Sequence, residues 1–265
     1  MSNKAVIVGI NKYHNPKNNL RGCINDANNM KSVLIDFFNF KESDIELLTD
    51  SSATKENIIN NLSSMVDNAK EGDNLVFFFS GHGSQIRDIN NDERKNRKDE
   101  LICPYDMDWV DKYILDDELK EIFSRLPNGV HLEVFLDSCH SGTMTDLKSS
   151  NIGTSKFIYP PLYILKGDIP KLKLNGFDKI ITNLLQTLFA ACTSNQYAIE
   201  DLINGSYNGA FTYYLCNILR TYKGDINRLK LRNKTLISLR KNKYKQHPKL
   251  ECNSKIKKYN LFKNQ

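Results

Sequence analysis

Several features that mark other classes of protein are missing from this sequence of 265 residues. No apolar run is long enough to cross a bilayer, and the apolar stretch at the N-terminus is too short for a signal peptide. The six cysteines include no CxxC pair, so we expect reduced thiols rather than a zinc site. There is no glycine-rich phosphate-binding motif and no internal repeat. We therefore expect a cytoplasmic protein with no membrane partner. We also expect no prodomain, because the first strand-like run begins close to the N-terminus.

The composition is that of an ordinary globular protein, with 40% hydrophobic and 26% charged residues. The length suits one large α/β domain or two small ones. The formal net charge of +6 is uneven, since residues 223–263 are dense in lysine and arginine. Such a segment can bind nucleic acid, but here the lysines alternate with apolar residues and asparagine. We interpret the segment as a solvated helix face and expect no nucleic-acid partner.

Short apolar runs alternate with segments of helical periodicity along most of the chain. This alternation favours a mostly parallel sheet covered by helices, which is an α/β fold. The lysine-rich stretch 146–180 has no such pattern, so we expect a functional or mobile connection there, and an exposed loop at 85–100. Strands are predicted at 5–10, 45–48, 74–79, 132–136, 187–192 and 247–252, and helices around 27–38, 54–66, 114–126 and 209–219.

Two of the predicted strands end in residues that could carry out chemistry. The strand at 132–136 is followed by Asp-Ser-Cys, which ends at Cys139, and the strand at 74–79 is followed by Ser-Gly-His-Gly, which contains His82. Neighbouring parallel strands would bring both side chains to one edge of the sheet, where ligands bind in open α/β sheets. His82 could instead be a packed structural histidine and Cys139 a small buried apolar residue. The glycines around His82 and the polar turn at Cys139 favour a functional pair.

A cysteine beside a histidine suggests nucleophilic catalysis. A thiol needs a base or a lowered pKa to become a thiolate. His82 would take the thiol proton of Cys139 and later protonate a leaving amine. Amide hydrolysis also needs donors for the oxyanion, and the backbone N–H groups of Gly83 and Cys139 lie at suitable strand ends.

Together these motifs resemble those of a known family. Ser-Gly-His-Gly at 80–83 and Asp-Ser-Cys-His-Ser-Gly at 137–142 are similar to the motifs of caspase-like cysteine peptidases of clan CD, and within them of metacaspases. The cysteine motif differs from the Gln-Ala-Cys form of caspases. The resemblance runs from residue 5 to about residue 219. It implies a mostly parallel six-stranded sheet flanked by helices on both faces. It also implies a monomeric, calcium-dependent endopeptidase that cleaves proteins or peptides after Arg or Lys.

The resemblance further implies a division of the chain. Residues 1–265 would form one caspase-like peptidase domain, with a large-subunit-like part at 1–146 and a small-subunit-like part at 187–265. Residues 147–186 would form a flexible linker, where this family often cuts its own chain. The candidate cleavage sites are Lys148, Lys156 and Lys166, and the sequence does not choose between them.

By the same resemblance, Asp26 and Asp137 would line the pocket for the residue before the cleaved bond, with Cys23 and Ser80 beside them. Carboxylates in a partly desolvated pocket suit a cationic partner, which the guanidinium of arginine supplies. The alternatives are structural, since Asp26 could only cap its helix, as could Asn25, and Asp137 could only complete a turn.

The resemblance implies a calcium site as well. The aspartates that correspond to it are Asp99, Asp116, Asp117 and Asp146. Carboxylate oxygens suit a hard cation such as Ca²⁺. The alternatives are a helix cap for Asp116 and plain solvation for Asp99 and Asp146.

Two other functions stay open. One is a catalytically silent caspase-like module that binds calcium or peptides. The other is an enzyme of another kind, in which the glycine-flanked turn at His82 holds a phosphate. Intact histidine and cysteine motifs speak against the first, and the lack of a phosphate-binding motif speaks against the second.

Overall fold

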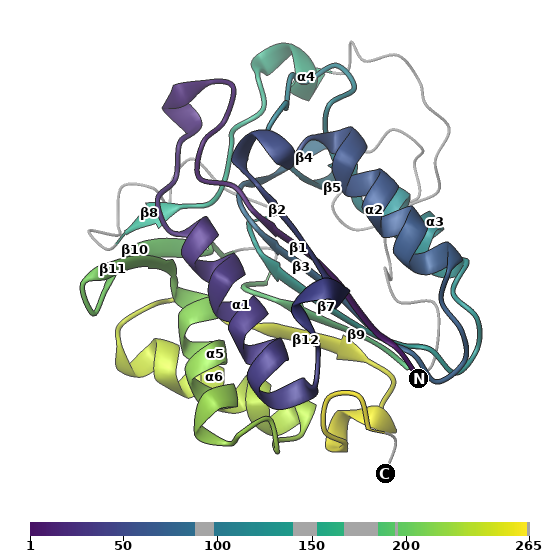
Figure 1. Ribbon diagram of the computed structural model, residues 1–265. Helices are drawn as coiled ribbons and strands as arrows, with labels where there is room; N and C mark the ends of the chain where they lie inside the picture. Colours follow the sequence, from purple (N-terminus) through teal and green to yellow (C-terminus); the bar gives the residue numbers. More distant parts are fainter. Residues whose placement is uncertain (88–97, 140–152, 167–184, 194–195, 264–265) are drawn as a thin grey trace.

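The computed structural model describes residues 1–87, 98–139, 153–166, 185–193 and 196–263. Its centre is a six-stranded sheet in the order β12-β9-β7-β3-β1-β2 (Figure 1). Every pair in it is parallel except β12 with β9, so the predicted mostly parallel sheet is confirmed. Its strands are β1 (Asn3–Gly9), β2 (Ile45–Thr49), β3 (Asn74–Ser80), β7 (His131–Asp137), β9 (Gln186–Ala190) and β12 (Lys249–Cys252).

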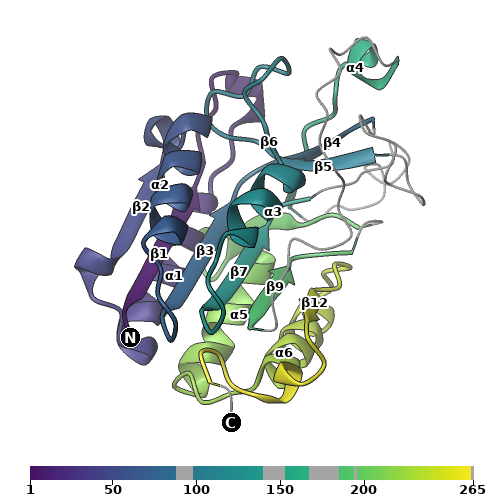
Figure 2. The ribbon, with the colours of Figure 1, turned by 90° about the vertical axis from the view of Figure 1, so that its right-hand side faces the viewer.

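Helices cover both faces of this sheet. Successive residues of β1 point to opposite faces, so Val6 belongs to one apolar core and Ile7 to the other. The first core packs against α2 and α3, and the second against α1 and α5, with α6 beyond α5 (Figures 1 and 2). The helices are α1 (Cys23–Phe38), α2 (Lys55–Asp67), α3 (Asp116–Ser124), α4 (Leu162–Lys166), α5 (Ala210–Thr221) and α6 (Arg228–Lys241), with short 3-10 turns at Pro16–Asn18, Glu42–Asp44, Asp50–Ser52 and Ile256–Lys258.

Two small sheets flank the carboxyl end of the large one. One consists of β4 (Gly83–Arg87), β5 (Lys98–Ile102) and β6 (Ile114–Leu115), and the other of β8 (Thr154–Ser155), β10 (Ile199–Ile203) and β11 (Ser206–Gly209). The expected exposed loop at 85–100 is therefore wrong at both ends. Ile86 pairs with Asp99 across the β4–β5 ladder, and both side chains are buried, so tertiary packing overrides the polar composition.

The hairpin of β10 and β11 was not predicted, although its turn carries a usable signal. Asn204 and Gly205 have φ of 50° and 84°, which is the backbone that tight two-residue hairpins require. Asn-Gly is the dipeptide that adopts it most readily. Strands of four and five residues with half-exposed polar positions gave no alternation strong enough to reveal them.

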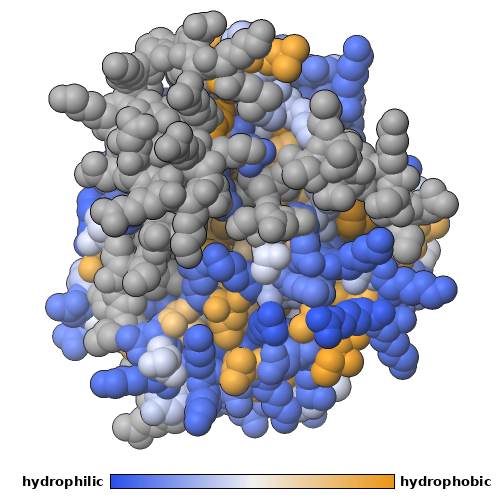
Figure 3. Space-filling model, turned by 180° about the vertical axis from the view of Figure 1, so that it is seen from behind, coloured by the Kyte–Doolittle hydropathy of each residue, from blue (hydrophilic) through white to orange (hydrophobic). Residues whose placement is uncertain are grey.

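The described surface seen from behind is mostly hydrophilic, with hydrophobic groups in small separate areas (Figure 3). Among the helices of the described residues, none is both long and apolar enough to cross a membrane.

The sheet register sets the position of the functional edge. Ser80, at the end of β3, pairs with Asp137, at the end of β7. The loops that follow these adjacent strands therefore leave the sheet side by side. Both strands are buried along their whole length, which explains why most of their residues are apolar.

Candidate active site

His82 lies two residues beyond the end of β3, and contacts at both its backbone and its ring fix its orientation. Its backbone N–H donates to the hydroxyl of Tyr13 at 2.7 Å. Its Nε2 lies 2.8 Å from the backbone oxygen of Asn18. Because a carbonyl oxygen can only accept, the ring proton is on Nε2, and Nδ1 has a free lone pair. Nδ1 is buried and has no hydrogen-bond partner among the residues that the structure describes. Asn18 was not predicted as a site residue, and a backbone oxygen leaves no signal in the sequence.

The environment of His82 keeps the ring neutral. Burial lowers its pKa to about 4, and the positive charge of Lys156 acts in the same direction, while the bond to Asn18 opposes them. At neutral pH the imidazole is therefore uncharged, which is the form that can accept a proton.

Cys139 lies two residues beyond β7 and is fully buried. Its Sγ accepts a hydrogen bond from the backbone N–H of Ala198 at 2.8 Å and lies 3.8 Å from Oγ of Ser155. Among the described residues, no hydrogen bond joins this thiol to the ring of His82. The structure brings the two residues to the same edge of the sheet, but the thiol would have to turn away from Ala198 to reach the imidazole.

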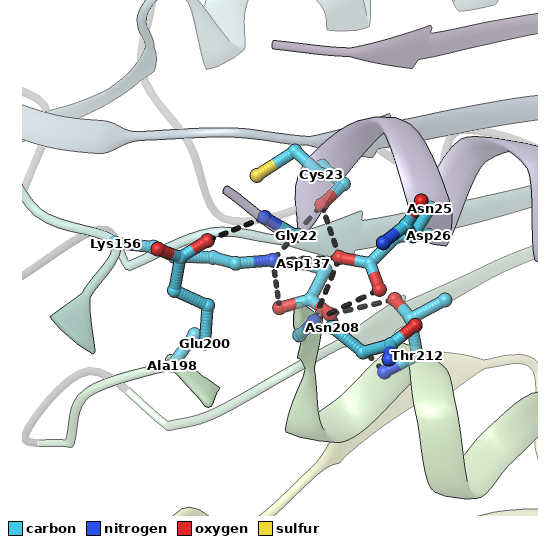
Figure 4. Close-up of polar contacts among 12 residues, drawn as sticks. Gly22, Cys23, Asn25, Asp26, Asp137, Lys156, Ala198, Glu200, Asn208 and Thr212 are labelled. Carbon is cyan, nitrogen blue, oxygen red and sulfur yellow. Dashed lines mark hydrogen bonds and ion pairs between the residues drawn. The ribbon is translucent and has the colours of Figure 1, made fainter. Parts of the chain in front are cut away.

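A lysine of the same chain fills the predicted cation pocket (Figure 4). The Nζ of Lys156 lies 3.0 Å from Oδ2 of Asp26, 3.1 Å from Oδ1 of Asp137 and 2.9 Å from Oγ of Ser80. The side chains of Lys156 and both aspartates are 0% exposed. The structure thus brings together three of the four residues expected to line this pocket, around an ammonium group.

The carboxylates of this pocket are held by further donors. Asp26 accepts the backbone N–H of Gly209 at 2.9 Å and the hydroxyl of Ser80 at 2.7 Å. Asp137 accepts the hydroxyl of Thr212 at 2.6 Å and its N–H at 3.1 Å. The helix α1 begins after Gly22, so the alternative in which Asp26 caps it is wrong. Asp26 is instead aimed at the pocket from the first turn of the helix.

Charges in this pocket shift one another's pKa. Burial raises the pKa of Asp26 to about 6, with Lys156 opposing the rise and Asp137 adding to it. Burial also acts to lower the pKa of Lys156, but Asp137 and Asp26 together outweigh it and raise that pKa well above its ordinary value. The pocket therefore stabilises a buried positive charge.

Gly209 forms part of the pocket wall and was not predicted as a site residue. A Cβ at this position would lie 2.3 Å from Oδ2 of Asp137 and 2.4 Å from Nζ of Lys156. Its φ of −65° suits any residue, so glycine is needed here for space and not for backbone freedom. A glycine before a helix is common, so nothing in the sequence indicates this role.

Cys23 and Glu200 lie around the same pocket. Cys23 starts α1, and its fully buried thiol lies beside Ser80, which agrees with its predicted place near the pocket. Glu200 accepts the backbone N–H of Gly22 at 2.8 Å and that of Arg21 at 2.9 Å. Glu200 therefore anchors the turn that precedes α1, a role that the sequence did not reveal.

The main chain of Lys156 is held as firmly as its side chain. Its carbonyl oxygen accepts the N–H of Gly83 at 3.0 Å and the N–H of Cys139 at 3.2 Å. These are the two groups that the sequence predicts as oxyanion donors. Two convergent backbone donors on one carbonyl make an arrangement that can stabilise a developing negative charge.

The predicted calcium residues are partly described. Asp99 lies on β5, Asp116 and Asp117 begin α3, all three are buried, and Asp146 lies outside the described residues. The N-cap of α3 is Leu115, so the expected capping role of Asp116 is wrong. Both carboxylate oxygens of Asp116 are buried, and no hydrogen-bond partner for them lies in the described part of the chain.

The acidic groups around Asp116 are close enough to perturb it. Burial raises its pKa well above the ordinary value, and the charges of Glu100, Asp99 and Asp117 add to the rise. A cation would relieve both effects, so the donor chemistry fits a hard metal ion. Within the described ranges, however, no group of three or more His, Cys, Asp or Glu residues is arranged to hold a metal ion. The described residues thus do not form a metal site by themselves.

Comparisons with known proteins agree with this arrangement. The family model described as "Metacaspase, peptidase C14 domain" matches residues 3–148. Metacaspase-1 from Schizosaccharomyces pombe is 31% identical over 94% of this chain and 67% of its own length. Metacaspase-1B from Neurospora crassa is 44% identical over 54% of this chain, and the match spans only 35% of that protein. The crystal structure of caspase-1 from Spodoptera frugiperda superposes with a TM-score of 0.60 at 12% identity, covering 94% of this chain and 88% of that one.

The fold, with a histidine and a cysteine after two adjacent parallel strands, is caspase-like. The chain belongs to the metacaspase family, peptidase C14, which is a family of cysteine peptidases.

Proposed function

We propose that this protein is a cysteine endopeptidase that cleaves after Lys or Arg with Cys139 as nucleophile and His82 as base. One observation carries the proposal. The ammonium of Lys156 lies between Asp26 and Asp137, while its carbonyl oxygen accepts hydrogen bonds from two convergent backbone N–H groups. A peptide with a cationic residue before the cleaved bond would make the same contacts.

The catalytic steps follow from the roles of these groups. Nδ1 of His82 takes the proton of the Cys139 thiol, and the thiolate attacks the carbonyl carbon. The N–H groups of Gly83 and Cys139 hold the oxygen as it becomes negative, where each such donor typically contributes about 3–4 kcal/mol. Asn18 keeps the other ring proton on Nε2, so the imidazolium has one proton to give, and it passes to the leaving amine. Water then hydrolyses the thioester and restores the thiol.

Specificity for a cation rests on the charge of the pocket. An anionic side chain in place of Lys156 would face two carboxylates in a site without water screening. Asp at the cleavage position should therefore be rejected. The guanidinium of Arg carries the same charge and can use both carboxylates through several N–H donors.

We also propose that Ca²⁺ regulates or supports the activity through Asp99, Asp116, Asp117 and Asp146. The support is the buried carboxylate of Asp116, which lies in an acidic environment and has no hydrogen-bond partner within the described ranges. Calcium there would neutralise this local charge. A cytoplasmic location is proposed as well, and it is supported by six cysteines that are all free thiols.

Fluorogenic peptides that differ only in the residue before the cleaved bond test the proposed function. We expect turnover of Arg and Lys peptides, faster with calcium than with a chelator, and none of Asp peptides. Cys139→Ala should remove the activity. Cys216→Ala, which changes another buried free cysteine, should keep it. Preference for Asp, or full activity of Cys139→Ala, would overturn the proposal, and peptide binding without turnover would favour a silent module.

A further inference from the structure

Tyr13 lies against the proposed base and contacts it in two ways. Its hydroxyl accepts the backbone N–H of His82 at 2.7 Å. Its ring packs against the imidazole, with 5.1 Å between the ring centroids and 49° between the ring planes. The Tyr13 side chain is buried and belongs to the apolar core on the side of α2 and α3. A residue of the loop after β1 thus touches both the main chain and the ring of His82.

The loop that carries Tyr13 makes a further contact to the imidazole. It comprises residues 11–20, between β1 and α1, and the backbone oxygen of Asn18 lies 2.8 Å from Nε2 of the ring. The N–H of Tyr13 donates to Oδ1 of Asn19 at 2.9 Å. At the start of the loop, Asp50 accepts two consecutive backbone N–H groups, each at 2.8 Å. The loop is therefore held at several points while it contacts the ring.

The hydroxyl of Tyr13 is the contact to the His82 backbone that a substitution can remove. The backbone oxygen of His82 accepts the N–H of Cys103 at 3.0 Å, and such a bond between main-chain groups does not depend on side chains. Space at the hydroxyl is tight, since a Cβ on Gly81 would lie 2.8 Å from it and 2.8 Å from the ring of Phe79. The glycine before the histidine therefore allows Tyr13 to approach.

The packing of an aromatic ring does not by itself account for the hydroxyl. Phenylalanine would fill the same place in the core without burying a polar group, which costs stability unless the group is hydrogen-bonded. Here the buried hydroxyl meets the N–H of the histidine that would act as base. Burial also raises the pKa of Tyr13 well above its ordinary value, so the hydroxyl is neutral at neutral pH.

We propose that Tyr13 is a positioning residue for His82. Its hydroxyl fixes the backbone of His82 and its ring supports the imidazole, so that Nε2 stays on Asn18 and Nδ1 is left to take the thiol proton of Cys139. The proposal rests on the proposed function, in which His82 is the base. Among the described residues, no hydrogen bond joins Tyr13 to the carboxylates of the cation pocket. Tyr13 should therefore support turnover and not the binding of a cationic substrate.

Tyr13→Phe keeps the ring and removes the hydroxyl, so the N–H of His82 loses its acceptor and the imidazole can shift. Misplacing a reacting group by about 1 Å can cost about a hundredfold in rate, so we expect kcat for an Arg peptide to fall at least about tenfold and KM to change less than about twofold. Tyr244→Phe is the matched control, because Tyr244 is also buried and its hydroxyl donates to Asp201 at 2.9 Å. It should keep the kinetics of the wild type.

A double-mutant cycle separates positioning from support of the fold. The readout is the rate at which iodoacetamide alkylates Cys139 at neutral pH, followed by peptide mass, because the thiolate is the form that reacts. Tyr13→Phe should lower this rate in the wild type and have no further effect in His82→Ala, since its effect passes through His82. An equal fold-change in both backgrounds would show that Tyr13 does not act through His82 and would overturn the proposal.

The Tm of each variant shows whether it folds, and Asn19→Ala serves as a second variant. Asn19 is exposed and holds the N–H of Tyr13, so its loss should lower kcat in the same way but by a smaller factor. An unchanged kcat in Tyr13→Phe, or in Asn19→Ala if Tyr13→Phe does not fold, overturns the positioning role alone.

This proposal and the proposed function can fail separately. A wild type that cleaves no peptide, with the alkylation cycle as expected, would overturn the proposed function and still support the positioning of His82. If His82→Ala changes neither peptide turnover nor the alkylation of Cys139, both fail.

Discussion

Replacing Asp137 by Asn should selectively weaken the cleavage of cationic substrates. The carboxylate of Asp137 has two tasks, since Oδ2 accepts the hydroxyl and N–H of Thr212 and Oδ1 faces the ammonium of Lys156 at 3.1 Å. Asn can keep the first task with its oxygen. Its NH₂ group would then face the cation, so a favourable contact becomes a repulsive one while the shape of the side chain is kept.

The size of the effect follows from burial. Lys156, Asp137 and Asp26 have no exposed side-chain surface, so neither water nor salt screens their charges. Removing one partner of a buried, hydrogen-bonded charge pair typically costs about 2–5 kcal/mol. Asp26 remains, so we expect the lower part of this range, about 2–3 kcal/mol. At 1.36 kcal/mol per decade, this is roughly a 30- to 150-fold fall in kcat/KM for an Arg peptide.

The assay compares two peptides that differ only in charge, with Arg or neutral citrulline before the cleaved bond. The kcat/KM of the Asn variant should fall for the Arg peptide and stay nearly the same for the citrulline peptide. The ratio of kcat/KM for the Arg peptide to kcat/KM for the citrulline peptide should therefore fall. An equal fall for both peptides would mean that Asp137 supports the fold or Cys139, two residues away, and not the cation. A fall of less than threefold on the Arg peptide would refute the charge argument itself.

Three further results are expected. Gly209→Ala should abolish cleavage of Arg and Lys peptides, since the added Cβ would lie 2.3 Å from a pocket carboxylate. The control Gly205→Ala should keep the activity despite a strained turn, because its added Cβ would meet no described neighbour within 4 Å. Unchanged kinetics of the Gly209 variant would show that this residue does not form part of the pocket wall. As the pH falls, kcat/KM should decrease at or above about pH 6, because Asp26, whose pKa is raised, gains a proton there and binds a cation more weakly. The value of kcat should decrease only nearer pH 4, because the pKa of His82 is lowered and the base becomes protonated there. A decrease of both parameters at pH 6.5 would contradict both assignments. In chelator at pH 7, Asp116→Asn should have a higher Tm than the wild type, because burial raises the pKa of Asp116 and its ionised form lowers stability once the pH exceeds the pKa of the unfolded state. Calcium should raise the Tm of the wild type and not that of the variant. A wild-type Tm that does not change with calcium would argue against the site.

Much of the sheet could be predicted from local sequence. The run at 75–79 is apolar without interruption, and the run at 132–136 is apolar except for Glu133, which forms a buried ion pair with Arg228. In the structure both strands are buried along their whole length. A strand covered on both faces favours a nearly continuous apolar sequence, and that pattern identifies it. The edge hairpin of β4 and β5 shows the opposite case. Its polar residues are buried by neighbouring elements, and no local pattern predicts that.

The cation pocket marks the limit of sequence reasoning most clearly. Asp26 lies beside its helix start in the sequence, and only the structure shows that its carboxylate meets Gly209 and Lys156, which are more than 100 residues away. Gly209 has ordinary backbone angles, so nothing local requires glycine there.

The sequence by itself determined the six strands of the central sheet, four of the helices and the positions of His82 and Cys139 after two of those strands, because buried strands favour nearly continuous apolar residues and the loops after adjacent parallel strands meet at one edge. Only the tertiary structure decided which lysine enters the pocket and which groups surround it. Lys148, Lys156 and Lys166 are alike as residues. Within the described residues, Lys166 ends a helix, whereas Lys156 combines an extended backbone beside Gly83 and Cys139 with a side chain that reaches two carboxylates, and contacts between distant parts of the chain decide that.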